Sequence, residues 1–151
     1  MDIPVFNLSN LKKSFFTFLI LCIIIGVVTI FGLTTIRNSE LGRMIYEINS
    51  WYVLCVFLVI NFFFGRHFRN ELKAIKETAD YDLKFKRYED RYRKRLIWNG
   101  FSLLLTCFLF ISSAKNFYLY LLLIQLLLLP VFYPWKKIIL KELGEEDIIF
   151  T

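Results

Sequence analysis

The chain has 151 residues, of which 57% are hydrophobic, and a formal net charge of +6 at pH 7. Its mean hydropathy of +0.53 is too high for an ordinary water-soluble domain, and its length suits one membrane domain over residues 1–151. Cys22, Cys55 and Cys107 lie singly in separate apolar runs, so we expect neither a disulfide framework nor a metal or other cofactor.

Four apolar runs predict four transmembrane helices. They cover about residues 14–36, 48–65, 96–114 and 117–133. The first run holds 23 residues without a charge, enough for the roughly 20 residues that cross a bilayer. Cys22, Gly26 and Thr29 share one face of that run, and small residues let membrane helices approach closely. Between the first two runs we expect a neutral external loop over about residues 37–47.

A polar segment, residues 66–95, separates the two apolar halves. It carries eleven Lys or Arg against six acidic residues. Its apolar residues form two helical stripes: Phe68, Leu72 and Ile75, then Tyr81, Phe85, Tyr88 and Tyr92. Helical spacing within each stripe predicts two antiparallel helical arms, about 66–79 and 82–95, which extend the flanking spans.

The two stripes are out of phase and meet near Asp80, whose side chain is a good helix cap. The stripes are expected to bury each other or to form an interaction surface for a partner. The alternative is one continuous helix that lies along the membrane surface.

The distribution of positive charge predicts the orientation. With four spans, sixteen Lys and Arg fall on the side of the central segment and three on the other. Positive residues mark the cytoplasmic side, so both termini and the arms are expected there. Compact loops and the lack of eukaryotic targeting motifs favour a bacterial inner membrane.

The C-terminal residues predict a short interfacial helix over 135–143, ended by Gly144. Pro130 and Pro134 end or kink the fourth span, and neighbouring groups would satisfy the freed carbonyl. The acidic run 145–147 is expected to fold back on the basic arms, with a frayed tail as the alternative.

Two further groups of residues are candidate sites. Positive residues near the membrane surface are candidates for anionic lipid headgroups: Arg91, Arg93, Lys94, Arg95, Lys136 and Lys137. Polar residues within the spans are candidates for helix packing or a pore lining: Asn61, Asn99, Ser102, Thr106 and Gln125. We favour packing, because no ionisable residue lies inside any span, and we expect Asn61 and Asn99 to bond to each other.

The sequence predicts an all-α integral membrane protein with four transmembrane helices in two hairpins and a cytosolic helical extension between helices 2 and 3. His67 is the only histidine, and no catalytic arrangement surrounds it, so we do not expect an enzyme. Nucleic-acid binding is not expected without a binding motif. We expect a membrane accessory or interaction protein, with lipids and a protein partner or further copies as its contacts. The alternative is a homo-oligomeric pore.

Overall fold

The computed structural model describes residues 4–31, 40–145 and 148–151, and the side chains of residues 40–43 are outside this description. The elements are β1 (Val5–Phe6), α1 (Leu8–Phe31), α2 (Glu40–Glu47), α3 (Ser50–Lys76), α4 (Tyr81–Ser113), α5 (Asn116–Leu128), the 3-10 helix η1 (Leu129–Phe132), α6 (Lys136–Leu143) and β2 (Ile149–Phe150). The end of the predicted first span, residues 32–36, lies outside the described residues. The all-α prediction is confirmed, apart from two short strands.

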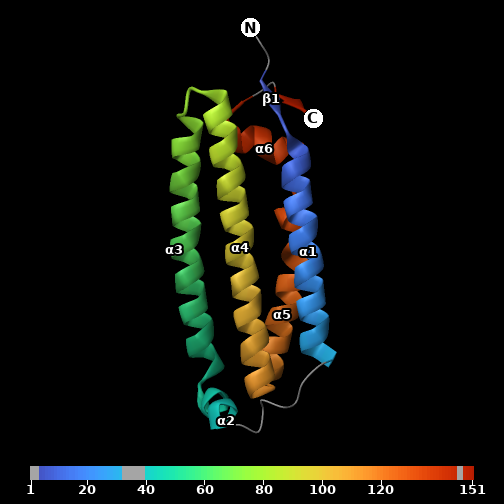
Figure 1. Cartoon of the computed structure of the whole chain (residues 1–151). Coiled ribbons are helices and arrows are strands. Elements are labelled where there is room, and N and C mark those ends of the chain that lie inside the picture. Colours follow the sequence, from blue (N-terminus) through green and yellow to red (C-terminus); the bar gives the residue numbers. More distant parts are fainter. Residues whose placement is uncertain (1–3, 32–39, 146–147) are drawn as a thin grey trace.

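The long helices form an elongated bundle around α4 (Figure 1). Helices α1 and α5 pack against α4 and against each other, whereas α3 packs mainly against α4 and, at one end, α6. Cys22, Leu103 and Leu122 are core residues that join α1, α4 and α5. Gly26 allows α1 to approach α5, since a Cβ there would lie 2.9 Å from Cδ1 of Leu126. Cys22, Gly26 and Thr29 are all buried, as their shared face predicts.

The central basic segment is helical and is divided where the two stripes change phase. α3 runs without a break to Lys76, and α4 starts at Tyr81. Asp80 caps α4, because its Oδ1 accepts a 3.0 Å hydrogen bond from the backbone N–H of Asp82. The two arms therefore exist as antiparallel extensions of α3 and α4 (Figure 1), and the alternative of one continuous helix is wrong.

Among the described residues, three helices, α1, α3 and α4, are long and apolar enough to cross a membrane. The fourth predicted span corresponds to α5 and η1, and a bend of 76° separates it from α6, where a short separate helix was predicted. Within the described residues, three helices, or up to four if the bent pair counts as one span, could cross a membrane. α5 rises about 20 Å and η1 about 8 Å more, which together approach the ~30 Å hydrocarbon core.

Two local predictions differ from the structure. The predicted external loop contains the helix α2, which packs against α4 and buries Ile45. The predicted second span begins too early, because Asn49 caps α3 by accepting a 3.0 Å hydrogen bond from the N–H of Trp51. A capping hydrogen bond marks the start of α3, and α2 is a short helix with one buried side chain; average hydropathy reports neither feature.

The two ends of the chain meet at the same end of the bundle as the α3–α4 turn (Figure 1), hereafter the basic end. β1 and β2 pair in parallel, with Val5 opposite Ile149 and Phe6 opposite Phe150. The N–H of Leu8 then donates a 2.8 Å hydrogen bond to the carbonyl of Thr151. The strands were not predicted, since two residues are too few to show an alternating pattern.

Candidate functional site

The apolar stripes of the arms lie inside the basic end. Phe68, Ile75, Phe85, Tyr88 and Tyr92 are buried, Leu72 packs on the same cluster, and Tyr81 is 41% exposed. Residues from both ends of the chain pack over these stripes. The Phe6 ring centroid lies 4.8 Å from that of Phe85. Ile139 and Leu143 of α6 complete the cluster. In this structure, the stripes stabilise the fold and offer a partner little beyond Tyr81.

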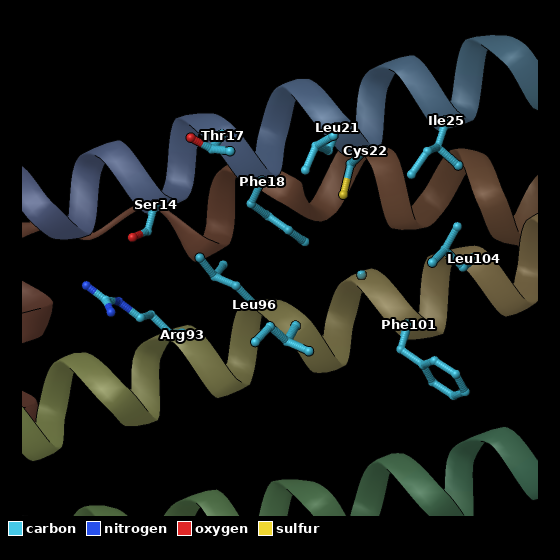
Figure 2. A pocket seen from close by; sticks show the side chains of 12 residues that line it. Ser14, Thr17, Phe18, Leu21, Cys22, Ile25, Arg93, Leu96, Phe101 and Leu104 are labelled. Carbon is cyan, nitrogen blue, oxygen red and sulfur yellow. The ribbon is translucent and has the colours of Figure 1, made fainter.

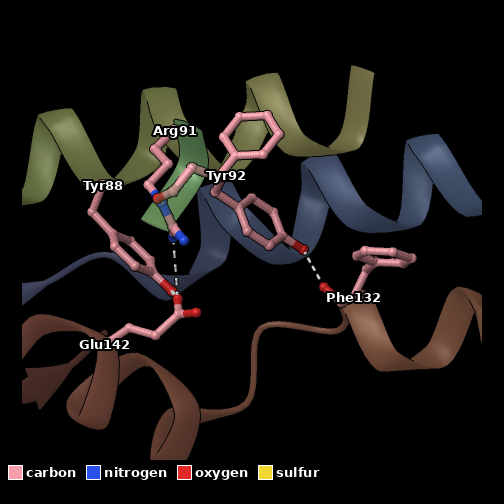
Figure 3. Close-up of polar contacts among 6 residues, drawn as sticks. Tyr88, Arg91, Tyr92, Phe132 and Glu142 are labelled. Carbon is pink, nitrogen blue, oxygen red and sulfur yellow. Dashed lines mark hydrogen bonds and ion pairs between the residues drawn. The ribbon is translucent and has the colours of Figure 1, made fainter. Parts of the chain in front are cut away.

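One carboxylate of α6 joins three helices through buried polar groups (Figure 3). The Tyr88 hydroxyl donates a 2.7 Å hydrogen bond to Oε2 of Glu142, and Nη1 of Arg91 lies 3.4 Å from the same oxygen. Nε of Arg91 also donates a 3.0 Å hydrogen bond to the carbonyl of Phe68 in α3. Arg91 is only 6% exposed, so these partners offset the cost of burying its charge.

Tyr88 is a proton donor in this contact. Burial raises the pKa of the Tyr88 hydroxyl well above its usual range, and the negative charge of Glu142 raises it further. A neutral hydroxyl can donate to the carboxylate at all physiological pH values. Glu142 is not among the site residues predicted from the sequence, because its partners Tyr88 and Arg91 lie more than 50 positions away in the chain.

A second link ties the C-terminal residues to α4. Lys84 is 4% exposed and forms a hydrogen-bonded ion pair with Glu145, whose other carboxylate oxygen is 3.5 Å from the Tyr81 hydroxyl. The expectation that the acidic run folds back on the arms is confirmed for Glu145. The rest of that run, residues 146–147, lies outside the described residues.

A side chain of α4 satisfies the carbonyl at the end of η1, which is not one of the carbonyls freed by Pro130 and Pro134. The Tyr92 hydroxyl donates a 2.8 Å hydrogen bond to the carbonyl of Phe132, at the last residue of η1 (Figure 3). Burial raises the pKa of the Tyr92 hydroxyl well above its usual range. The guanidinium of Arg95 lies 5.1 Å from the Phe132 ring centroid. α4 therefore supplies the donor that the interrupted helix lacks.

The predicted headgroup residues divide into internal and exposed groups. Arg91 does not face a lipid headgroup as predicted, because its guanidinium is buried and bonded to Glu142 and to the Phe68 carbonyl. Lys94 is exposed but pairs with Glu71 at 3.1 Å. Arg93, Lys136 and Lys137 are exposed at the basic end.

The shallow polar residues of the spans do not form the expected pair. Oδ1 of Asn61 accepts a 3.2 Å hydrogen bond from Nε1 of Trp98, while Nδ2 of Asn99 donates to the carbonyl of Arg95 at 2.7 Å. The prediction of an Asn61–Asn99 bond is therefore wrong. Indole N–H is a donor only, so a buried tryptophan competes well for an amide oxygen. The Asn61–Trp98 bond links α3 to α4.

The deeper polar residues face other helices. Thr106 is 1% exposed and donates a 3.1 Å hydrogen bond to the carbonyl of Ser102, itself buried. Gln125 is partly buried, and its Oε1 has no hydrogen-bond partner among the described residues. Ser102 and Thr106 therefore lie inside the bundle.

Within the described residues, no group of three His, Cys, Asp or Glu side chains is arranged to hold a metal ion. His67 lies on the exposed face of α3, with Nε2 3.3 Å from Oε1 of Glu71. Comparison with protein-family models, curated proteins and solved structures finds no match to this chain.

Proposed function

We propose that this chain is a non-enzymatic, multi-pass accessory subunit of a bacterial inner-membrane protein, with its basic end in the cytoplasm. The charge distribution supports this orientation: the central basic segment, both ends of the chain and α6 gather at one end of the bundle (Figure 1). The opposite end carries Lys115, whose Nζ lies 5.1 Å from the ring centroid of Tyr46 in α2. Crossing by α1, α3, α4 and the α5–η1 segment brings both termini to the same side.

The observation that carries the proposal is the uncovered outer face of α3. None of the residues in the apolar 18-residue stretch of α3 is buried, whereas 39% of the residues in the corresponding stretch of α4 are buried. Phe68 and Ile75, the two buried residues of α3, lie on its inner face near the cytoplasmic end. On the opposite face Val59 is 54% and Phe63 is 63% exposed.

This outer face changes character along its length. Helical spacing places Arg66 and Lys73 in line with Val59 and Phe63, and both basic side chains are exposed. The apolar row thus continues into a basic row. Charge complementarity identifies the occupant that we propose: a transmembrane helix of another protein that continues into an acidic cytoplasmic segment. In that complex, Arg66 and Lys73 would each face a carboxylate of the partner.

Site-specific photo-crosslinking tests this docking face. A photoreactive amino acid at Phe63 should crosslink one discrete membrane protein with an acidic juxtamembrane segment. The matched control is Ile24 of α1, which is 54% exposed on another helix and should yield lipid adducts. Arg66→Glu with Lys73→Glu should remove the protein adduct, and charge reversal of the partner's acidic segment should restore it.

Three outcomes would contradict the proposal. Lipid adducts alone at Phe63 would mean that lipid covers α3. Insensitivity of the protein adduct to charge reversal would remove the argument from complementarity. An adduct to a second copy of this chain would favour the alternative homo-oligomer.

A further inference from the structure

A groove runs along the junction of α1 and α4 (Figure 2). Its volume is about 530 Å³. Ser14, Thr17 and Arg93 line one end, and apolar side chains line the remainder. Leu21 is 53% and Leu104 is 49% exposed, so the groove opens on the flank of the bundle. Neither α3 nor its outer face contributes to it.

The groove has the length of one lipid chain. α1 and α4 run in the same direction here, and Arg93 and Leu104 mark the two ends on α4. Eleven residues at ~1.5 Å each span about 16 Å, close to half of a ~30 Å hydrocarbon core. Gly100 forms part of the floor, where a Cβ would lie 3.3 Å from Cε2 of Phe18. The missing side chain lets the Phe18 ring of α1 pack closely on α4 in the middle of the groove.

The polar end combines one donor with two acceptors. Arg93 is 53% exposed, and its Nη2 lies 4.0 Å from Oε2 of Glu89, the outer limit for an ion pair. The hydroxyls of Ser14 and Thr17 each donate a 3.0 Å hydrogen bond to the backbone of their own helix. Their oxygens therefore remain as acceptors, while the guanidinium is free to bind an anion in a bidentate manner.

We propose that this groove binds one glycerophospholipid from the leaflet at the basic end. The phosphate lies on Arg93, and one acyl chain follows the apolar wall between α1 and α4. The Ser14 and Thr17 oxygens accept from the headgroup, which suits an ammonium or a hydroxyl group beyond the phosphate. This inference does not depend on the docking face of α3.

Native mass spectrometry of the full chain released from detergent tests the site. The probes are phosphatidylethanolamine and phosphatidylglycerol, with diacylglycerol of the same acyl chains as the phosphate-free arm. We expect the wild-type chain to retain one molecule of a phospholipid and little diacylglycerol. Arg93→Gln should weaken retention about tenfold or more, because it removes a charge-assisted contact.

Two groove-filling variants test the apolar wall separately. Leu21→Trp and Leu104→Trp each enlarge an exposed side chain from opposite walls, so the packed core is not disturbed. Each should reduce retention to a similar degree. Lys86→Gln is the matched control: it removes one exposed charge of α4 outside the groove and should leave retention unchanged.

The proposal is overturned if wild-type protein binds no preferred single lipid, or if diacylglycerol binds as well as the phospholipids. Equal loss in Lys86→Gln and Arg93→Gln would mean that the net charge, and not this site, controls retention. Unchanged binding in both Trp variants would place the lipid elsewhere. The ethanolamine and glycerol arms distinguish which headgroup the acceptors favour.

Discussion

The Tyr88 hydroxyl lies 2.7 Å from Oε2 of Glu142, a residue 54 positions further along the chain. This hydrogen bond joins α4 to α6, and Arg91 extends the link to α3 through the Phe68 carbonyl. The helix α6 thereby closes the basic end, although it leaves η1 through a sharp bend. The bond also gives the buried Tyr88 hydroxyl a partner inside the basic end.

Tyr88→Phe should destabilise the protein by about 1–3 kcal/mol, because it leaves a partly buried carboxylate oxygen with Arg91 as its remaining partner. Denaturant unfolding in detergent, followed by circular dichroism, measures the change. Tyr120→Phe is the control, since Tyr120 is 63% exposed. An equal effect of both substitutions would show that the Glu142 contact adds nothing.

Stability should fall in alkaline solution. The pKa values of Tyr88 and Tyr92 are raised in the folded state, so their contribution is intact below the unfolded tyrosine pKa of about 10. Above that pH the unfolded chain loses these protons first, and stability declines by about 1.4 kcal/mol per pH unit for each tyrosine. Unfolding of wild type and the Tyr88→Phe, Tyr92→Phe double variant across pH 9–11.5 checks this. The double variant should show the shallower decline, and identical slopes would contradict the assignment.

The N-terminal strand should contribute strongly to stability. Phe6 is 1% exposed and its ring lies against Phe85, Tyr88 and Phe150. Phe6→Ala should cost about 3–5 kcal/mol and free the C-terminal strand for proteolysis. Val5→Ala, at a side chain 56% exposed, should change the free energy of unfolding by less than about 1 kcal/mol. Protection of the C-terminus in Phe6→Ala would show that the strands pair without this core.

Substitutions at two glycines should have opposite effects on the stability of the fold. Gly26→Ile forces bulk into the contact with Leu126 and should destabilise the α1–α5 packing by about 1–3 kcal/mol. Gly65→Ala meets no atom within 4 Å and should be neutral or stabilising by up to about 1 kcal/mol through helix propensity. Thermal unfolding of the two variants compares them directly. A loss at Gly65 would indicate that this face of α3 is already covered by a partner or another copy.

The proposed orientation can be tested by thiol labelling. In a cysteine-free background, Ala79→Cys marks the α3–α4 turn and Asn116→Cys marks the opposite end, and both positions are exposed. A membrane-impermeant reagent should label Asn116→Cys from the outside and Ala79→Cys only after permeabilisation. The reverse pattern would place the basic end outside.

Local chemistry made much of the architecture predictable. The phase change between the two stripes and the capping side chain of Asp80 located the turn between α3 and α4. Gly144 ends α6 with a φ of 73°, a backbone conformation in which glycine lacks the strain of other residues. Hydropathy alone located the apolar cores of α1, α3 and α4. Each of these signals lies within a few residues of the feature that it determines.

The features that were not predicted from the sequence depend on residues far apart in the chain. Glu142 pairs with Tyr88 and Arg91 only because α6 folds back across the basic end. The pairing of β1 with β2 joins the two ends of the chain, and the α1–α4 groove needs the packing of helices about 80 residues apart. Any of several acidic residues could have been the hydrogen-bond partner of Tyr88, so periodicity and composition could not identify Glu142.

The proposed function requires that this chain works as one copy bound to a different membrane protein. The direct measurement is the mass of the complex extracted from its native membrane into nanodiscs, with all polypeptides identified. We predict a single 18.1 kDa chain together with a second membrane protein that carries an acidic cytoplasmic segment. A closed ring of this chain with no other polypeptide would contradict the proposed function and favour the homo-oligomeric pore.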